Sequence, residues 1–454
     1  MVTLYKPRAR TSLQGKVLEL QITENDYEGN GVGRYQQKIV FVSGALAGEQ
    51  VQVQITEDKA DYLKASVRKV LTAAATRVKP ACKHFGQCGG CQLQYLEPVQ
   101  QQQLKQQGID KLIRHTTGLA ALPWQPMLSA SPEGYRRKAR IGVWYDKKSR
   151  RFTVGFRQAA AKTLTDIEQC LVLSPVIAPV FGILKSVLPA ISQPTAVTHV
   201  EAIDADGRAF LIVRHVQMLT VAEKQAFISA WPEAVWIGES APGQFDYWQE
   251  TTVALSYQLT TQQLTLAFSP DDFIQVNAAV NQLMVNQALD WLAPQPDQHI
   301  LDLYCGMGNF SLALSQRAAK VVALEGMAKM VQQANINAAL NRQSNVEFAQ
   351  ADLHLPWPDA AWHKPEYQKI VLDPARAGAQ GAVGQLLKLK AAQILYVSCN
   401  AATFARDAKV ILAAGYQLHK ISGIDMFPQT SHLELMALFN REGAADPGNM
   451  IGSR

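Results

Sequence analysis

The 454-residue sequence lacks any uninterrupted apolar stretch long enough to span a lipid bilayer. Its most apolar segment, Leu171 to Ile191, is broken by three prolines and by Lys185. The N-terminal residues MVTLYKPRAR are basic but lack the apolar core of a secretory signal. Internal repeats are also absent. We therefore expect a cytoplasmic protein without membrane association, and we expect it to be a monomer.

Cysteine is scarce too, with six residues in 454, which argues against a disulfide scaffold. Three of the six fall within ten residues and have the spacing of a metal-ligand set: Cys82, Cys88 and Cys91. A fourth ligand is expected at Cys170, because the other two cysteines belong to a C-terminal region with a different pattern. Four thiolates suit zinc or an iron–sulphur cluster, and the spacing leaves both open.

The net charge of +6 is modest, but the basic residues are unevenly placed. Residues 133–157 hold nine Lys or Arg against two acids. A charged run is usually a solvated face. Here aromatic residues are interleaved with the charges, which favours an RNA-binding surface where bases stack and phosphates pair with cations. These aromatics are Tyr135, Trp144, Tyr145, Phe152 and Phe156.

The length predicts about three domains of ~150 residues. Residues 1–72 contain short strands with Gly-rich turns, which predict a small β-barrel. Residues 73–270 begin with a cysteine-bearing loop and a Gln-rich helix, and then return to strand patterns. Residues 271–442 alternate helix and strand, which predicts an α/β domain with a parallel sheet. We expect the helix within 93–124 to pack on this α/β domain and residues 443–454 to be disordered.

A glycine-rich turn in the α/β region has the pattern of a cofactor loop. The predicted strand 300–304 leads into Cys-Gly-Met-Gly-Asn-Phe at 305–310, where glycines allow close approach of a ligand. Glu325 ends the next strand, 19 positions after Gly306, and is placed to bond ribose hydroxyls. After a third strand, Asp352 suits an adenine amino group.

The alternative is a nicotinamide site. That motif requires a third glycine, and position 311 is Ser. Asp302, within the first strand, suits S-adenosylmethionine (SAM) better, since it could reach the methionine end. The three acids on three strands favour a Rossmann-like, SAM-dependent methyltransferase domain.

Cys399 lies where a predicted strand hands over to a predicted helix, 401–414. Ligands bind at that edge of open α/β sheets, and a helix N-terminus favours a thiolate, so we expect a reactive thiol. The alternative is a buried, inert cysteine. Glu434 borders the last predicted strand, where a plain strand-end charge is the alternative interpretation.

Together with Asp373, these residues indicate methylation at C5 of uracil. A thiolate that adds to C6 makes C5 nucleophilic, and a base must then remove the C5 proton. Cys399 suits the nucleophile, Glu434 the base and Asp373 the group that bonds the uracil edge. Ala375 and Arg376 stand where methyltransferases acting on amino nitrogens tend to carry an aromatic residue, which argues against a nitrogen acceptor.

The chain resembles the RNA 5-methyluridine methyltransferases over nearly its whole length. The matching motifs are DPARAG at 373–378, YVSCN at 396–400 and HLE at 432–434, with FSPDDFIQVN at 268–277. The resemblance implies that Cys399 is the nucleophile and Glu434 the base. It implies cofactor contacts from Gln275, Tyr304, Asn309, Glu325, Asp352 and Asp373. Ala401 replaces a frequent Pro and Tyr304 a usual Phe, and neither change removes a functional group.

The same resemblance implies a [4Fe–4S] cluster on Cys82, Cys88, Cys91 and Cys170, which would pin the loop to the basic domain. The N-terminal unit resembles a TRAM domain, an RNA-binding barrel. Barrel, cysteine cluster and methyltransferase together are most similar to family members that act on 23S ribosomal RNA. The alternatives are another rRNA site or tRNA, or a non-catalytic RNA-binding iron–sulphur protein.

Overall fold

The computed structural model describes residues 12–159, 161–357, 362 and 366–443. The tail expected to be disordered therefore lies outside the described residues, apart from Gly443. The chain forms two compact units. One holds the residues up to Ala81 with Cys91–Ile109 and Gln429–Ser431, and the other holds Cys82–Gly90, Asp110–Pro428 and the residues from His432 onward.

The first unit contains a closed five-stranded barrel in the strand order β1-β2-β3-β5-β4. Period-two alternation builds its core, since β4 buries Val51, Val53 and Ile55 and leaves the glutamines between them more exposed. A Cβ atom at Gly31 would lie 2.9 Å from Ile22, so β2 can approach β1 there only as glycine. The strands are β1 Val17–Asn25, β2 Gly31–Tyr35, β3 Lys38–Ser43, β4 Gln50–Asp58 and β5 Tyr62–Thr72.

Helix α1, Pro98–Thr117, contributes its residues up to Ile109 to this unit. Its Gln101 is buried and donates to the Gln429 side chain (2.8 Å), while the Gln429 backbone N–H donates back to Gln101 (3.0 Å). The N–H of Leu93 also donates to the Gln429 carbonyl, at 3.0 Å. A short segment from far along the sequence is thereby built into the N-terminal unit.

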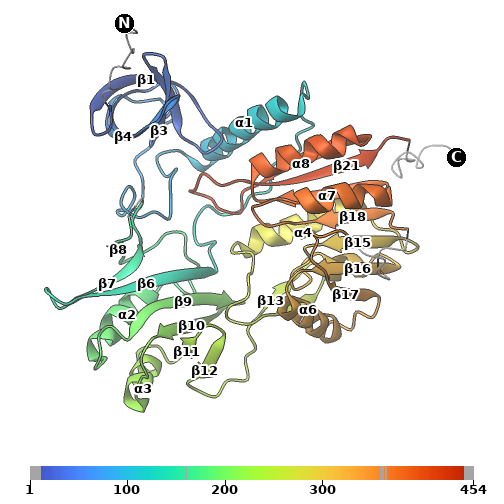
Figure 1. Cartoon of the computed structure of the whole chain (residues 1–454). Coiled ribbons are helices and arrows are strands. Elements are labelled where there is room, and N and C mark those ends of the chain that lie inside the picture. The colour runs from blue at the N-terminus through green and yellow to red at the C-terminus, as the bar shows by residue number, and fades with distance from the viewer. Residues whose placement is uncertain (1–11, 160, 358–361, 363–365, 444–454) are drawn as a thin grey trace, which may run out of the picture. The chain divides into compact units, whose positions relative to one another are not determined.

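The second unit contains a seven-stranded mixed sheet in the order β12-β11-β10-β9-β6-β7-β8. Helices α2 (Val180–Val187) and α3 (Val221–Ala230) contact each other and cover one face, where Phe181, Phe227 and Trp236 are fully buried (Figure 1). A 3-10 turn, Leu188–Ala190, follows α2. The strands are β6 Lys138–Asp146, β7 Arg151–Arg157, β8 Leu164–Asp166, β9 Val197–Ala205, β10 Arg208–His215, β11 Val235–Ala241 and β12 Gln244–Tyr247.

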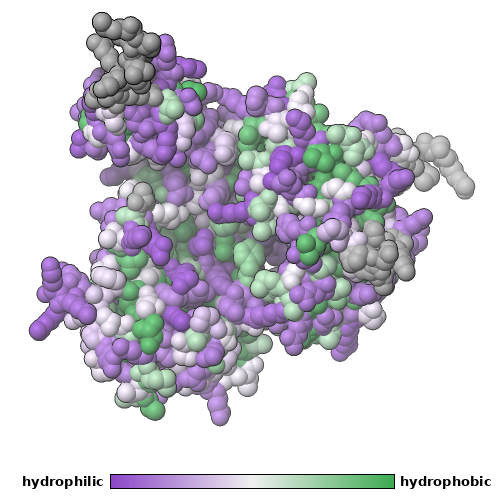
Figure 2. Space-filling view, viewed as in Figure 1, coloured by the Kyte–Doolittle hydropathy of each residue, from purple (hydrophilic) through white to green (hydrophobic). Residues whose placement is uncertain are grey.

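The β6–β7 hairpin carries much of the basic segment noted in the sequence. Its connecting end is exposed and forms a hydrophilic projection on the left of Figure 2. Trp144 on β6 is 65% exposed, whereas Tyr145 packs on Phe152 with ring centroids 4.9 Å apart. The hairpin therefore presents cations and an open indole to solvent.

A second seven-stranded sheet follows, in the order β17-β16-β15-β18-β19-β21-β20. Strands β15 to β19 are parallel, and helices α7 and α8 lie beside the β18–β21 part of the sheet (Figure 1). The expected parallel sheet has one exception. β21 is antiparallel to both β19 and β20, because a loop without a crossover helix joins β20 to β21.

The elements of this region agree with the expected alternation of helix and strand. A two-stranded ribbon, β13 Ser256–Leu259 and β14 Leu264–Ala267, precedes it. The strands are β15 His299–Leu303, β16 Lys320–Glu325, β17 Val346–Gln350, β18 Lys369–Leu372, β19 Gln393–Ser398, β20 Tyr416–Ile424 and β21 Glu434–Arg441. The helices are α4 Ala278–Leu292, α5 Ser311–Ser315, α6 Ala328–Leu340, α7 Gln380–Leu386, the 3-10 turn Leu387–Leu389 and α8 Ala401–Ala413.

The segment after α1 lies along the edge strand β20. The N–H groups of Gln125 and Leu128 donate to carbonyls of β20 at 2.7 and 2.9 Å, and the Trp124 indole donates to Asp110 at 2.9 Å. This segment therefore covers an edge that would otherwise expose unpaired backbone groups. Among the helices of the described residues, none combines the length and the apolar character needed to cross a bilayer.

Candidate active site

The glycine-rich turn after β15 folds as the sequence predicts. Gly306 and Gly308 have φ of +55° and +100°, values that favour glycine. A Cβ atom at Gly308 would lie 3.2 Å from both Leu312 and Phe348, so the turn must pass close to these side chains as bare backbone. Helix α5 then begins at Ser311 and ends at Ser315.

Glu325, at the end of β16, is tied to this turn. Its carboxylate accepts hydrogen bonds from the N–H groups of Gly306 (3.1 Å) and Met327 (3.0 Å). Asp352, beyond β17, accepts from the N–H of His354 (3.0 Å). Both acids therefore stand at the carboxyl edge of the sheet with fixed orientations, as the three-acid pattern predicted.

Three buried polar atoms around this turn have no hydrogen-bond partner among the described residues. They are one carboxylate oxygen of Asp302, the hydroxyl of Tyr304 and the side-chain oxygen of Gln275. The other Asp302 oxygen accepts from the Ser311 hydroxyl. Burial raises the pKa of Asp302 to about 7, and the nearby Asp373 and Glu325 add to this rise. The hydrogen bond from Ser311 acts in the opposite direction. Such a set suits a ligand that offers donors and a positive charge.

Asn309 is held by residues that the sequence did not single out. Its side-chain oxygen accepts from the hydroxyl of Tyr257 (3.0 Å) and from Asn281 (3.1 Å), and its amide nitrogen donates back to Asn281 (2.9 Å). Tyr257 comes from the β13–β14 ribbon and Asn281 from α4. The position of Asn309 is therefore set by two elements outside the cofactor loop.

Cys399 lies directly after β19, and Asn400 caps helix α8. The Asn400 side chain accepts from the N–H of Ala402 (3.0 Å) and donates to the carbonyl of Arg376 (3.2 Å). Arg406, one turn further along α8, donates to the carbonyl of Ala377 (3.0 Å). These bonds hold the 373–378 loop against the start of α8. Asp373 and Cys399 are therefore kept together at the carboxyl edge of the sheet, after β18 and β19.

Three titratable groups come together at this edge. Glu434 is 7% exposed, and burial with a further contribution from Asp373 raises its pKa to about 8. Burial also raises the pKa of Asp373, to about 7. Burial, then Glu434 and Asp373, raise the pKa of the Cys399 thiol to about 11, although Arg376 opposes this.

The expectation that the start of α8 stabilises a thiolate is therefore wrong for the free chain. Desolvation and two neighbouring carboxyl groups disfavour a negative charge on Cys399 more than the helix end favours it. Both shifts favour the protonated forms of the Cys399 thiol and of Glu434. A cation or a substrate that enters this site would change the pKa values of these groups.

The chain matches known proteins over nearly its whole length. Residues 234–353 and 359–442 match the tRNA (Uracil-5-)-methyltransferase family, and residues 11–67 match the TRAM domain. The 23S rRNA (uracil(1939)-C(5))-methyltransferase RlmD of Vibrio cholerae is 40% identical over 452 residues, covering 98% of this chain and 100% of that protein. The chain belongs to the RlmD family. RlmD of Pectobacterium carotovorum is 42% identical over 446 residues, covering 97% and 98%.

A solved structure has the same fold. It is the tRNA (uracil-54, C5)-methyltransferase of Pyrococcus abyssi in complex with S-adenosyl-L-homocysteine, with a TM-score of 0.71 and 20% identity. The match covers 93% of this chain and 100% of that chain. The SAM-dependent methyltransferase fold and the N-terminal TRAM domain inferred from the sequence are confirmed.

Three of the four cysteines predicted as metal ligands belong to one unit. Burial raises the pKa of Cys88 and of Cys170, and the thiols of Cys82 and Cys88 add to this at Cys170, so the three interact. Backbone N–H groups point at two of the sulphurs, from Gly90 to Cys88 (3.4 Å) and from Val172 and Leu173 to Cys170. Cys91 belongs to the other unit. Within the described residues, no group of three His, Cys, Asp or Glu is arranged to hold a metal ion.

The sequence missed the residues that support the site from a distance. Arg137, directly before β6, donates to the carbonyl of Gln275 (2.7 Å) and lies 4.3 Å from the ring centre of Tyr257. Asp407 on α8 accepts from Tyr396 (2.8 Å) behind the Cys399 strand. Neither Arg137 nor Asp407 lies in a recognisable motif. The run of nine basic residues was the one available signal, and it did not distinguish Arg137 from its neighbours.

Proposed function

We propose that this protein transfers a methyl group from SAM to C5 of a uridine in 23S ribosomal RNA, through a covalent bond between Cys399 and C6 of the base. The observation that carries the proposal is the grouping of a half-buried thiol with the buried carboxyl group of Glu434 and the half-buried one of Asp373, at the sheet edge that holds the glycine-rich turn. Family membership supports the choice of 23S rRNA, since the curated relatives carry that activity in their names.

We assign the SAM contacts to Gln275, Tyr304, Asn309, Glu325, Asp352 and Asp373. SAM would supply the methyl group and a sulphonium positive charge. The unpartnered oxygens of Asp302 and Gln275 and the raised pKa of Asp302 fit a cationic ligand in that position. A positive charge there favours the ionised carboxylates, so it also lowers the pKa of Glu434 toward the range in which this group can act as a base.

The chemistry of this chain then follows from the three grouped residues. Cys399, which is partly exposed, gives its proton to solvent, and its sulphur adds to C6. The addition moves electron density to C5, which would take the methyl group from SAM and leave S-adenosyl-L-homocysteine. Glu434 accepts the C5 proton. The C5–C6 double bond forms again, the C6–S bond breaks, and the thiolate leaves. Asp373 bonds the uracil edge and holds the base in register with the thiol.

Tritium release from C5-labelled uridine in a 23S rRNA fragment, with SAM present, tests the reaction. We expect release that depends on SAM and on Cys399. Tight RNA binding without release would instead indicate a non-catalytic RNA-binding protein. Mapping 5-methyluridine in a deletion strain tests the substrate, and an unchanged 23S rRNA with depleted tRNA would overturn that part of the proposal.

We also propose that Cys82, Cys88, Cys91 and Cys170 hold a [4Fe–4S] cluster. The mutual interaction of three of these thiols and the N–H groups directed at two sulphurs support thiolate ligands. Cys91 is assigned from the Cys82-x5-Cys88-x2-Cys91 spacing and from the family resemblance. Iron and sulphide analysis after anaerobic purification tests this, and stoichiometric zinc without sulphide would refute it.

We also propose that the chain has three functional regions. These are a barrel at 1–72, a central region at 73–270 and a methyltransferase region at 271–442. The exposed cations and Trp144 on the β6–β7 hairpin support an RNA-contacting role for the central region. RNA crosslinking of the full chain with peptide mapping tests this role, and crosslinks confined to residues beyond 271 would contradict it.

A further inference from the structure

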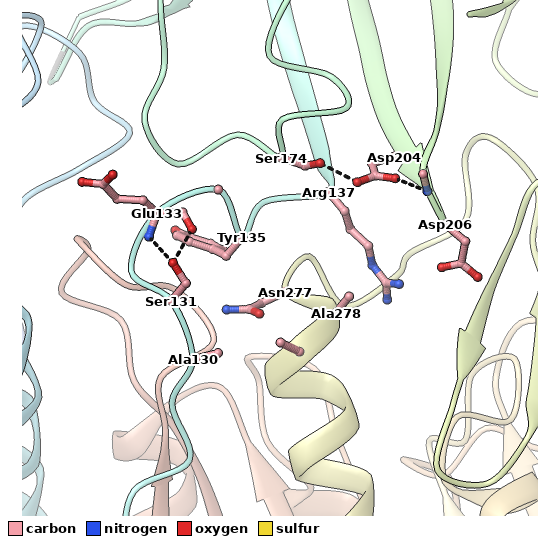
Figure 3. A pocket seen from close by; sticks show the side chains of 13 residues that line it. Ala130, Ser131, Glu133, Tyr135, Arg137, Ser174, Asp204, Asp206, Asn277 and Ala278 are labelled. Atoms are coloured by element: carbon pink, nitrogen blue, oxygen red, sulfur yellow. Dashed lines mark hydrogen bonds between the residues drawn. The ribbon is translucent and has the colours of Figure 1, made fainter. Parts of the chain in front are cut away.

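The second unit contains a cavity of about 280 Å³ that is separate from the predicted catalytic and cofactor residues, none of which lines it. It lies between the 130–135 loop, the turn that joins β9 to β10, and the N-terminus of α4 (Figure 3). Its volume is close to the lower end of the range for ligand pockets. The cavity can therefore take one small ring system, such as a single nucleobase.

Two buried hydrogen-bond donors face this cavity without a partner. Arg137 is 4% exposed, and its Nε donates to the Gln275 carbonyl while one terminal nitrogen, Nη2, has no acceptor among the described residues. Asn277 is 1% exposed, and its oxygen caps α4 at the N–H of Val280 (3.2 Å) while its amide nitrogen has no acceptor there. Both residues line the cavity, with the Asn277 amide on the side of Ser131 and Ala130 and the Arg137 guanidinium on the side of Asp206 (Figure 3). A buried donor without a partner is unfavourable, so both would gain from a ligand that brings acceptors.

The acidic residues of the cavity decide what kind of ligand it takes. Three carboxylates line it, from Glu133, Asp204 and Asp206, against the single guanidinium of Arg137. That balance disfavours a phosphate. Asp204 is already bonded by the Ser174 hydroxyl and by the N–H of Gly207 (2.8 Å). Asp206, on the exposed β9–β10 turn, accepts from the backbone N–H of Gln258 and keeps further acceptor capacity, because a carboxylate has several lone pairs. Carboxylate acceptors beside amide and guanidinium donors match a ring edge that carries both an amino group and acceptor atoms.

We propose that this cavity binds one non-target nucleobase of the RNA, a base with an exocyclic amino group (adenine, guanine or cytosine), and so contributes to the choice of the methylation site. Arg137 and Asn277 donate to its ring or carbonyl acceptors, and Asp206 accepts from its amino group. This inference rests on the proposed function in that it takes the ligand to be the RNA substrate.

The connection to the predicted active site gives the cavity a role in specificity. The same Arg137 side chain that offers Nη2 to the cavity holds the carbonyl of Gln275 through Nε, at 2.7 Å. A base bound in the cavity therefore stands at a fixed distance from the residues that would receive the target uridine. An RNA that lacks a suitable base at that spacing would bind in the wrong register or more weakly.

RNA affinity of the full chain, measured without SAM, tests this. The probe is a 23S rRNA fragment around the target uridine in which each other nucleotide is replaced in turn by an abasic site. We expect one abasic position, distinct from the target, to weaken binding about tenfold, in keeping with the 1–3 kcal/mol of a specific base contact. Uridine at that position should weaken binding as well, because it has no exocyclic amino group.

Two variants link that position to the cavity. Asn277→Asp keeps the oxygen that caps α4 and removes the free amide, and Asp206→Asn suits the left-handed backbone at that turn (φ +47°) while removing the charge. Each variant should bind the intact RNA more weakly than the wild type does. An abasic site at the sensitive position should then cause no additional loss of affinity. Asn335→Asp, which adds the same charge on the exposed surface of α6, is the matched control and should bind like the wild type.

Other outcomes overturn the inference. If both variants keep the wild-type response at every abasic position, the cavity does not read a base. If every abasic RNA binds like the intact one and a neutral methylphosphonate link weakens binding instead, the ligand is a phosphate. Failure of the proposed methylation is a separate result, because it appears as absent turnover on intact RNA whatever the affinity pattern.

Discussion

Two buried glutamates of this protein have opposite surroundings. Glu49 in the barrel is fully buried and is bonded by Arg77 (2.8 Å) and by the N–H of Leu46 (2.9 Å). Burial alone would raise its pKa, but these partners bring the pKa below its usual value. Glu434 is buried without an opposite charge and beside Asp373, so its pKa rises. A buried acid with partners stabilises the fold, whereas one among like charges is available for chemistry.

The largest effect should come from the thiol beside Glu434. We predict that Cys399→Ala lowers methyl transfer by about 10⁴-fold or more and removes any covalent RNA adduct, because no other group on the edge can add to C6. Methyl incorporation and gel-stable protein–RNA complexes are the measurements. Cys399→Ser, which keeps the volume, should fail equally, and turnover by either variant would contradict the nucleophile assignment.

Glu434→Gln should block turnover but let the adduct accumulate, since proton removal follows addition and methyl transfer. The adduct is quantified on denaturing gels over time. Wild-type protein should show little, because elimination clears it. Equal adduct levels in the two proteins would argue against Glu434 as the base.

The barrel glutamate should behave in the opposite way. Glu49→Gln leaves Arg77 without its anion, so we expect the barrel to lose on the order of 3 kcal/mol of unfolding free energy with catalysis on short RNA retained. Hydrogen exchange of β1–β5 in the full chain is the measurement. Glu57→Gln is the control, because the exposed pairing of Glu57 with Lys59 and Lys64 contributes little to stability. It should change the unfolding free energy of the barrel by less than about 1 kcal/mol.

The two glutamates also predict opposite pH dependence of stability. With a depressed pKa, Glu49 contributes stability that is present above its unfolded pKa of about 4.5 and is lost as pH falls through the folded value. Glu434 binds a proton more tightly in the folded state, so its contribution is full below about 4.5 and is lost as pH rises to about 8. Thermal unfolding of wild type and Glu434→Gln should therefore diverge between these pH values, with the variant relatively more stable at pH 8. A constant difference would contradict the raised pKa.

The smallest effect concerns the support of the cofactor loop. Tyr257→Phe removes one of two hydrogen bonds to the Asn309 oxygen and keeps the ring beside Arg137. A loss of about 1 kcal/mol corresponds to about fivefold weaker SAM binding, measurable by calorimetry. Tyr416→Phe, which removes a buried hydrogen bond to Ala391 at the opposite side of the sheet, should leave SAM binding unchanged.

The local pattern of the sequence was sufficient to predict most strands of the α/β region and the positions of its motifs. Strand 320–325, the turn at 305–310 and the strand–cysteine–helix handover at Cys399 all follow from apolar runs and glycine placement, because these depend on neighbours in the chain. The strand direction of β21 did not follow, since a loop and a crossover look alike in a short apolar sequence.

What only the tertiary structure decided is the electrostatic state of the site and its support. The raised pKa of Cys399 arises from Glu434 and Asp373, which are 35 and 26 positions away in the sequence and meet it only in the folded sheet. The contact between Arg137 and Gln275 joins two different sheet regions. Residue types and spacing determined which chemical groups this protein has. Burial and long-range contacts determined which of them carry protons, because desolvation depends on everything packed around a group.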